Sequence, residues 1–214
     1  MDVAIIDYKM SNLYSVQSAC SKIGLTSVIT SDKQQILNAH SAILPGVGAF
    51  GEAMIHLKDM GIDKIIHSFV DGGKPFIGIC LGLQLLFESS DEFGFNQGLG
   101  ILKGRVKKFN LKSSNDNKYP IPQVGWNRID QLNKKWKNSL LCNNKSGDFM
   151  YFVHSHYVEP EKEDVVIASS NYGGKRYCSA VKKENVFATQ FHPEKSGLVG
   201  IKIYEELKNH LRRF

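Results

Sequence analysis

Short apolar runs alternate with amphipathic stretches through the first 90 residues of the chain. Apolar or β-branched runs of this length predict buried strands, and apolar positions that recur every three or four residues predict helices that bury one face. The expected strands cover residues 3–6, 27–30, 42–44 and 75–79. The expected helices cover residues 13–23, 52–60, 62–70 and 81–88, with a short helix that Ser31 caps and that runs through Leu37. Strand–helix alternation of this kind predicts a parallel sheet covered on both faces.

The second half of the chain is richer in strands. Further strands are expected at residues 101–109, 123–129, 150–153, 165–168, 179–181 and 186–189, and an amphipathic helix at residues 201–211. A polar, turn-rich link falls around residues 113–117. We find no repeat and no linker long enough to separate domains. The pattern predicts one α/β domain over residues 1–214, with a mostly parallel central sheet flanked by helices and an added β-rich portion.

Composition narrows the class of protein. The chain has 214 residues, 42% of them hydrophobic and 22% charged, which is typical of a folded globular protein. No apolar run approaches the ~20 residues of a membrane span, so we expect no membrane insertion. Asp2 stands where a signal peptide needs a basic start, which favours a cytoplasmic protein. The cysteines at 20, 80, 142 and 178 are too far apart for a metal clip, and we expect no metal and no cofactor.

The net charge of +6 is unevenly placed. Residues 101–145 hold eleven Lys and Arg against two acids, a local charge of +9, while the rest of the chain sums to −3. This basic segment could meet nucleic acid, a phosphorylated ligand or an acidic protein face, or be an ordinary solvated surface. The chain has no aromatic RNA-binding pattern and no helix-turn-helix signal, so we expect no nucleic acid.

The sharpest local motif is Gly78-Ile79-Cys80-Leu81-Gly82. A Gly-x-nucleophile-x-Gly sequence between a buried strand and a helix is the nucleophile-elbow pattern, with Cys here in place of Ser. The glycines are needed because the turn is tight. The turn also places the sulfur at a helix N-terminus, which favours the reactive thiolate. The alternative interpretation is a buried cysteine that only packs at the end of a strand.

Two further segments supply what a cysteine nucleophile lacks. In Gln190-Phe191-His192-Pro193-Glu194, His192 and Glu194 are two residues apart, so an extended segment would point both to the same side. The imidazole could then move protons while the carboxylate orients it. The glycine-rich stretch at residues 45–51 follows an expected parallel strand and could offer backbone N–H groups to a developing negative charge.

Five motifs together resemble a known family: Pro-Gly-Val-Gly-Ala-Phe-Gly, Gly-Ile-Cys-Leu-Gly-Leu-Gln-Leu-Leu-Phe-Glu, Val-Gly-Trp-Asn, Tyr-Phe-Val-His-Ser and Gln-Phe-His-Pro-Glu-Lys-Ser-Gly. The chain is similar to class I (triad) glutamine amidotransferases over nearly its whole length. The last three motifs resemble most the glutaminase subunits of imidazole glycerol phosphate synthase, from histidine biosynthesis. The resemblance implies that the chain forms a heterodimer with a (β/α)₈ barrel synthase subunit and passes ammonia to it.

The resemblance also implies a role for each matching position. It makes Cys80, His192 and Glu194 the catalytic triad, with an oxyanion hole formed by backbone at Val47, Gly48 and Leu81. The positions that would hold glutamine are Gly46, Gln84, Glu92, Ser155 and His156. The positions that would face the barrel subunit are Trp126, Tyr151 and Lys195.

Three departures from the family pattern leave more than one biosynthetic pathway to consider. They are Lys9-Met10-Ser11-Asn12 after Asp7-Tyr8, Gln123-Val124 before the Gly-Trp-Asn motif, and His156 in place of the usual Tyr. A paralogous amidotransferase, which supplies ammonia for acetamidino sugars of surface glycans, therefore remains an alternative. A stand-alone Cys-elbow hydrolase and a catalytically silent binding module are alternatives from other classes.

Overall fold

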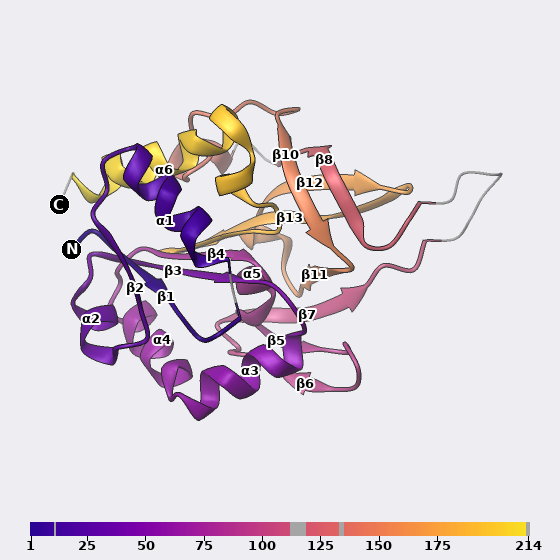
Figure 1. Ribbon diagram of the computed structural model, residues 1–214. Coiled ribbons are helices and arrows are strands. Elements are labelled where there is room, and N and C mark those ends of the chain that lie inside the picture. Colours follow the sequence, from indigo (N-terminus) through magenta and orange to yellow (C-terminus); the bar gives the residue numbers. More distant parts are fainter. Residues whose placement is uncertain (11, 112–118, 133–134, 213–214) are drawn as a thin grey trace.

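The main sheet has a parallel core and an antiparallel extension. The computed structural model describes residues 1–10, 12–111, 119–132 and 135–212 (Figure 1). In this part of the chain the main sheet runs β2-β1-β3-β4-β14-β13-β12-β9. Its parallel strands are β1 (Val3–Ile6), β2 (Ser27–Thr30), β3 (Ser41–Gly46), β4 (Phe76–Cys80) and β14 (Val186–Thr189). The antiparallel strands are β13 (Lys175–Lys183), β12 (Val166–Tyr172) and β9 (Asp130–Gln131).

Helices cover both faces of this sheet. They are α1 (Leu13–Lys22), α2 (Lys33–Asn38), α3 (Phe50–Asp59), α4 (Ile62–Asp71), α5 (Leu81–Leu85) and α6 (Gly197–Leu211). Alternate residues of β1 point to opposite sides: Ala4 joins the core under α2, α3 and α4, and Ile5 joins the core under α1 and α6 (Figure 1). The predicted mostly parallel sheet with flanking helices is confirmed.

The added β-rich portion consists of two smaller sheets. One pairs β8 (Gln123–Arg128) with β10 (Phe149–His154), and the other has the order β11-β7-β5-β6. The strands of the second are β5 (Phe87–Ser90), β6 (Asn96–Gln97), β7 (Leu102–Lys108) and β11 (His156–Pro160). Short 3₁₀ turns lie at η1 (Lys135–Asn138), η2 (Glu163–Val165) and η3 (Pro193–Lys195). In the described part of the chain, no helix has the length and apolar character needed to span a bilayer.

The boundaries differ from the sequence prediction in identifiable ways. Asp32, not Ser31, caps α2, because its carboxylate accepts the N–H of Gln35 at 2.8 Å. The helix expected at residues 81–88 ends after Leu85, since the following residues form β5 and pair with β7. The link expected around residues 113–117 lies outside the described residues.

The carboxyl ends of three neighbouring strands bring the sequence motifs together. Gly46 at the end of β3 lies opposite Cys80 at the end of β4, and Thr189 at the end of β14 lies opposite Ile79. The glycine-rich loop, the elbow and the segment that contains His192 therefore leave the sheet at one edge. Ligands bind at this edge in open α/β sheets.

Candidate active site

Cys80 sits on a strained turn between β4 and α5. Its backbone has φ 56° and ψ −108°, a conformation that a side chain disfavours and that occurs mostly where tertiary structure imposes it. The turn leaves no room for a side chain at Gly82, where a Cβ atom would lie 1.8 Å from the carbonyl oxygen of Leu44. This is the strand–turn–helix arrangement that the Gly-x-Cys-x-Gly motif predicts.

His192 and Glu194 form a buried pair. The Nδ1 atom of His192 lies 2.7 Å from Oε1 of Glu194, and both side chains are almost fully buried. The sequence analysis assumed an extended segment here. The structure differs, because Glu194 lies in the 3₁₀ turn η3. The turn nevertheless brings the carboxylate back to the ring. Tyr151 holds the segment in place, since its carbonyl oxygen accepts the His192 N–H at 2.9 Å.

The electrostatic state of His192 depends on Cys80. Burial lowers the pKa of His192, but the Cys80 sulfur and the Glu194 carboxylate outweigh burial and raise this pKa to about 10. Since Nδ1 faces Glu194, Nε2 is the nitrogen left to exchange a proton with the sulfur. Nε2 is buried, and a hydrogen bond with Cys80 is among the causes that raise the pKa of His192. The three side chains, far apart in sequence, thus interact as one unit.

The sulfur borders a cavity of about 240 Å³. Most of the residues predicted for the oxyanion hole and for glutamine line it: Val47, Gly48, Leu81, Gln84, Glu92, Ser155 and His156. Gly46 does not line it; it is buried behind the wall, where a Cβ atom would lie 2.2 Å from the hydroxyl oxygen of Tyr8. Pro122, Val153 and His154 also line the cavity, and the sequence analysis gave none of these a role.

An acidic and a basic group face each other in this cavity. Oε1 of Glu92 lies 3.4 Å from Nδ1 of His156, and Oε2 accepts the backbone N–H of Phe50 at 2.7 Å, at the start of α3. Burial lowers the pKa of His156, Glu92 raises it and Lys108 lowers it, with a net decrease. A lowered pKa keeps the imidazole largely neutral near pH 7, which leaves the Glu92 charge available to a cationic group.

The glycine-rich loop holds one of its expected donors away from the cavity. The N–H of Val47 donates to the carbonyl oxygen of Met10 at 3.1 Å. In this conformation Val47 therefore cannot also donate to an oxyanion. The next residue, Gly48, lines the cavity and has a φ of 100°, a backbone conformation that glycine adopts readily and other residues rarely do.

Two buried side chains near the sulfur were missed by the sequence analysis. Gln190 places its Nε2 atom 3.7 Å from Cys80 Sγ, and its Oε1 accepts from Gln84 Nε2 at 3.1 Å. His154 lies among aromatic rings with Nδ1 2.7 Å from the His156 carbonyl oxygen, and burial lowers its pKa to about 4. Both residues lie inside motifs that the family resemblance uses, but nothing in the sequence indicated which groups their side chains contact.

The residues predicted to face a partner form one cluster next to the His192–Glu194 pair. The rings of Trp126 on β8 and Tyr151 on β10 lie 6.2 Å apart, edge to face, and Lys195 Nζ lies 6.0 Å from the Tyr151 ring centre. Trp126 is 56% exposed, which is unusual for so large an aromatic side chain. The Tyr151 carbonyl oxygen also accepts the His192 N–H, so this surface adjoins the His192–Glu194 pair.

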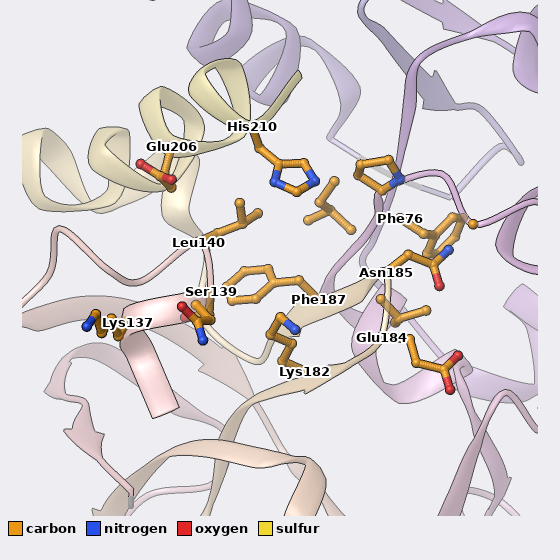
Figure 2. Close-up of a pocket in the computed structure, with 15 residues that line it drawn as sticks. Phe76, Lys137, Ser139, Leu140, Lys182, Glu184, Asn185, Phe187, Glu206 and His210 are labelled. Atoms are coloured by element: carbon orange, nitrogen blue, oxygen red, sulfur yellow. The ribbon is translucent and has the colours of Figure 1, made fainter. Parts of the chain in front are cut away.

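A larger cavity of about 300 Å³ lies elsewhere. Figure 2 shows it near Phe76 and Phe187, at the amino ends of β4 and β14, with Lys182 and His210 at its wall. It contains none of the residues predicted for the site. The described residues include no cluster of His, Cys, Asp and Glu suited to a metal ion.

Comparisons with known proteins agree with the geometry. The family model "Glutamine amidotransferase class-I" matches residues 4–205. The imidazole glycerol phosphate synthase subunit HisH of Aquifex aeolicus is 45% identical over 209 residues, 97% of this chain and 96% of that protein. The subunit of the same name from Bacillus subtilis is 42% identical over 201 residues, 94% of this chain and 92% of that protein. Among solved structures, PurLQS from Thermotoga maritima shares the fold with a TM-score of 0.71 at 19% identity, over 98% of each chain.

Proposed function

The chain belongs to the class-I glutamine amidotransferase family, and from that premise we propose that it is the glutaminase subunit of an imidazole glycerol phosphate synthase. It hydrolyses the side-chain amide of glutamine to glutamate and ammonia, and the ammonia serves histidine biosynthesis. The observation that carries the chemistry is the buried His192–Glu194 pair, 2.7 Å apart, electrostatically coupled to the Cys80 sulfur at the mouth of a cavity.

In the proposed mechanism the Cys80 thiol loses its proton to Nε2 of His192. The thiolate attacks the carboxamide carbon, and the oxyanion is stabilised by backbone N–H groups at Leu81 and at the Val47–Gly48 loop. His192 returns the proton to the leaving nitrogen, which departs as ammonia and leaves a γ-glutamyl thioester. Water, deprotonated by His192, then adds to the thioester, and glutamate leaves as the proton returns to the sulfur. Glu194 orients the imidazole and stabilises its charged form.

The other end of the cavity suits the amino-acid group of glutamine. Glu92 offers a carboxylate whose orientation is fixed by the Phe50 N–H, so it can pair with an α-ammonium group. His156 lies beside that carboxylate, and Ser155 lines the same wall. Gln84 and Gly46 complete the set implied by the family resemblance, with Gly46 acting from behind the wall by letting the strand pass close to Tyr8.

A synthase partner follows from the relatives, which are subunits of imidazole glycerol phosphate synthase. We propose that it is a (β/α)₈ barrel, which docks as a heterodimer over Trp126, Tyr151 and Lys195 and receives ammonia directly. The exposed indole can anchor such an interface, and Lys195 can pair with an acid of the barrel. Cytoplasmic location remains a prediction.

The test is glutamate release from glutamine by the purified chain, alone and with each candidate synthase. We expect release that Cys80→Ala abolishes, and ammonia transfer only with the synthase of histidine biosynthesis. Because Val47 N–H is bound to Met10, we also expect slow release by the chain alone and faster release when docking frees that N–H. Transfer only with a sugar-modifying synthase would favour the paralogue. Hydrolysis of esters or peptides, with no glutamate released from glutamine, would reject the proposed glutaminase activity.

A further inference from the structure

Gln190 is a fully buried amide beside the nucleophile, with no part in the mechanism above. It follows β14 directly, and its backbone N–H donates to the carbonyl oxygen of Ser179 at 2.9 Å. Its side chain reaches the sulfur, with Nε2 3.7 Å from Cys80 Sγ. A buried amide is costly unless its polar atoms are paired, so the direction in which it faces is set by its partners.

Gln84 determines that direction. Its Nε2 atom donates to the backbone carbonyl of His156 at 3.1 Å and to Oε1 of Gln190 at 3.1 Å. A carbonyl oxygen only accepts, so the atom of Gln84 that faces it must be the nitrogen. Oε1 of Gln190 therefore faces Gln84, and the Gln190 nitrogen must face the sulfur. A rotated Gln190 amide would bring two donors together and leave one N–H of each amide without an acceptor.

The sulfur consequently lies between two groups with opposite preferences. On one side, the carbonyl oxygen of Val153 lies 3.7 Å away and can only accept the thiol proton. On the other side, the Gln190 N–H can only donate, and a thiolate accepts a hydrogen bond far better than a thiol does. When the proton moves to His192, the Val153 contact loses its hydrogen and faces a negative charge. The Gln190 contact becomes a charge-assisted hydrogen bond at the same moment.

We propose that Gln190 is a further catalytic residue, which stabilises the Cys80 thiolate through an N–H···S hydrogen bond that Gln84 orients. The proposal rests on the proposed function only in taking Cys80 as the nucleophile. Since the sulfur is negative before attack and again when the thioester is hydrolysed, the same N–H acts in both halves of the reaction. Loss of the N–H should reduce the thiolate fraction and the rate of glutamate release together.

The experiment measures the rate of Cys80 alkylation by iodoacetamide as a function of pH, with the modified Cys80 peptide quantified by mass spectrometry. In Gln190→Met the side chain keeps its length and loses its N–H. We expect the midpoint of the alkylation curve to rise by about 1 pH unit. Gln123→Met is the matched control, because Gln123 is also buried but bonds to Tyr177. Its midpoint should equal that of the natural chain.

A second variant tests the orientation itself. In Gln84→Met the side chain can no longer donate to Gln190 and adds no charge near the sulfur, so the Gln190 amide is no longer held with its nitrogen toward the sulfur. The midpoint should rise although residue 84 does not touch the sulfur. If Gln190→Met does not fold, as judged by circular dichroism, Gln84→Met alone decides. An unchanged midpoint in the folded variants overturns the proposal. Alkylation needs no glutamine, so failed glutamine hydrolysis with a shifted midpoint would reject the proposed function and leave this inference standing.

Discussion

His154 should make the protein sensitive to mild acid. The side chain is buried between the rings of Phe109, Phe152 and Tyr177, and its Nδ1 bonds to the His156 carbonyl. Burial lowers its pKa from 6.5 to about 4 in the folded chain, so the ring folds in its neutral form. The unfolded chain takes up a proton at this position near pH 6.5, and the folded chain does so only near pH 4. Stability from the neutral ring is therefore present above pH 6.5 and lost as the pH falls to about 4.

The size of this loss follows from the shift in pKa. Each unit of pKa corresponds to about 1.4 kcal/mol, so a decrease from 6.5 to about 4 makes His154 responsible for a loss of roughly 3 kcal/mol. That is a large share of the ~5–15 kcal/mol by which a typical domain is stable. We expect the asparagine variant His154→Asn to remove this pH dependence, because its amide can still donate to the His156 carbonyl but does not titrate in this range.

The assay is urea unfolding at a series of pH values, for the natural chain and for His154→Asn. Any constant cost of the substitution cancels, because only the change of unfolding free energy with pH is compared. The matched control is His67→Asn on the exposed side of α4, which should keep the natural slope. Equal slopes in His154→Asn and the natural chain would show that burial does not hold His154 neutral in the folded chain.

Two further predictions concern the proposed triad and the elbow. Glu194→Gln keeps an oxygen for His192 Nδ1 but removes the charge that helps raise the pKa of His192, so kcat for glutamate release should fall at least about 100-fold with little change in KM. Gly82→Ala should destabilise the fold by about 3 kcal/mol or more in urea unfolding, because its Cβ would meet the Leu44 carbonyl oxygen at 1.8 Å.

Each of these has a control elsewhere in the chain. Glu205 is an exposed acid on α6, and Glu205→Gln should leave kcat unchanged. Gly72 ends α4 with φ −70°, where a Cβ meets only carbonyls of its own last turn, so Gly72→Ala should change stability by less than about 1 kcal/mol. An unchanged kcat in Glu194→Gln would remove the carboxylate from the mechanism, and a stable Gly82→Ala would contradict the close approach at the elbow.

The parallel half of the fold was predictable because its strands and helices are each encoded locally. Short apolar or β-branched runs such as residues 3–6 and 27–30 pair with near neighbours, and the elbow glycines mark where β4 ends. The helix expected at residues 81–88 failed because β7, which lies later in the chain, pairs with residues 87–90 and ends the helix after one turn. Local periodicity contains no information about that pairing.

The candidate site divides in the same way. Cys80 and His192 stand in short motifs whose spacing indicates a nucleophile and a group that transfers protons. The sequence alone was therefore enough to nominate them. Gln190 stands in one of those motifs as well, but its contact with Gln84 joins residues 106 positions apart. His154 could be recognised as a histidine, but the aromatic rings around it come from residues 109, 152 and 177, which are distant in the sequence. Burial and long-range pairing, which give these two residues their properties, have no local sequence signal.

In the proposed reaction the Cys80 sulfur forms a covalent bond with the glutamyl group of glutamine. This bond can be detected by mixing the chain with glutamine, quenching in acid and measuring the mass of the Cys80 peptide. We expect a γ-glutamyl adduct on Cys80, which forms during turnover and disappears when glutamine is exhausted. Release of glutamate with no adduct on Cys80, or undiminished release by Cys80→Ala, would contradict it.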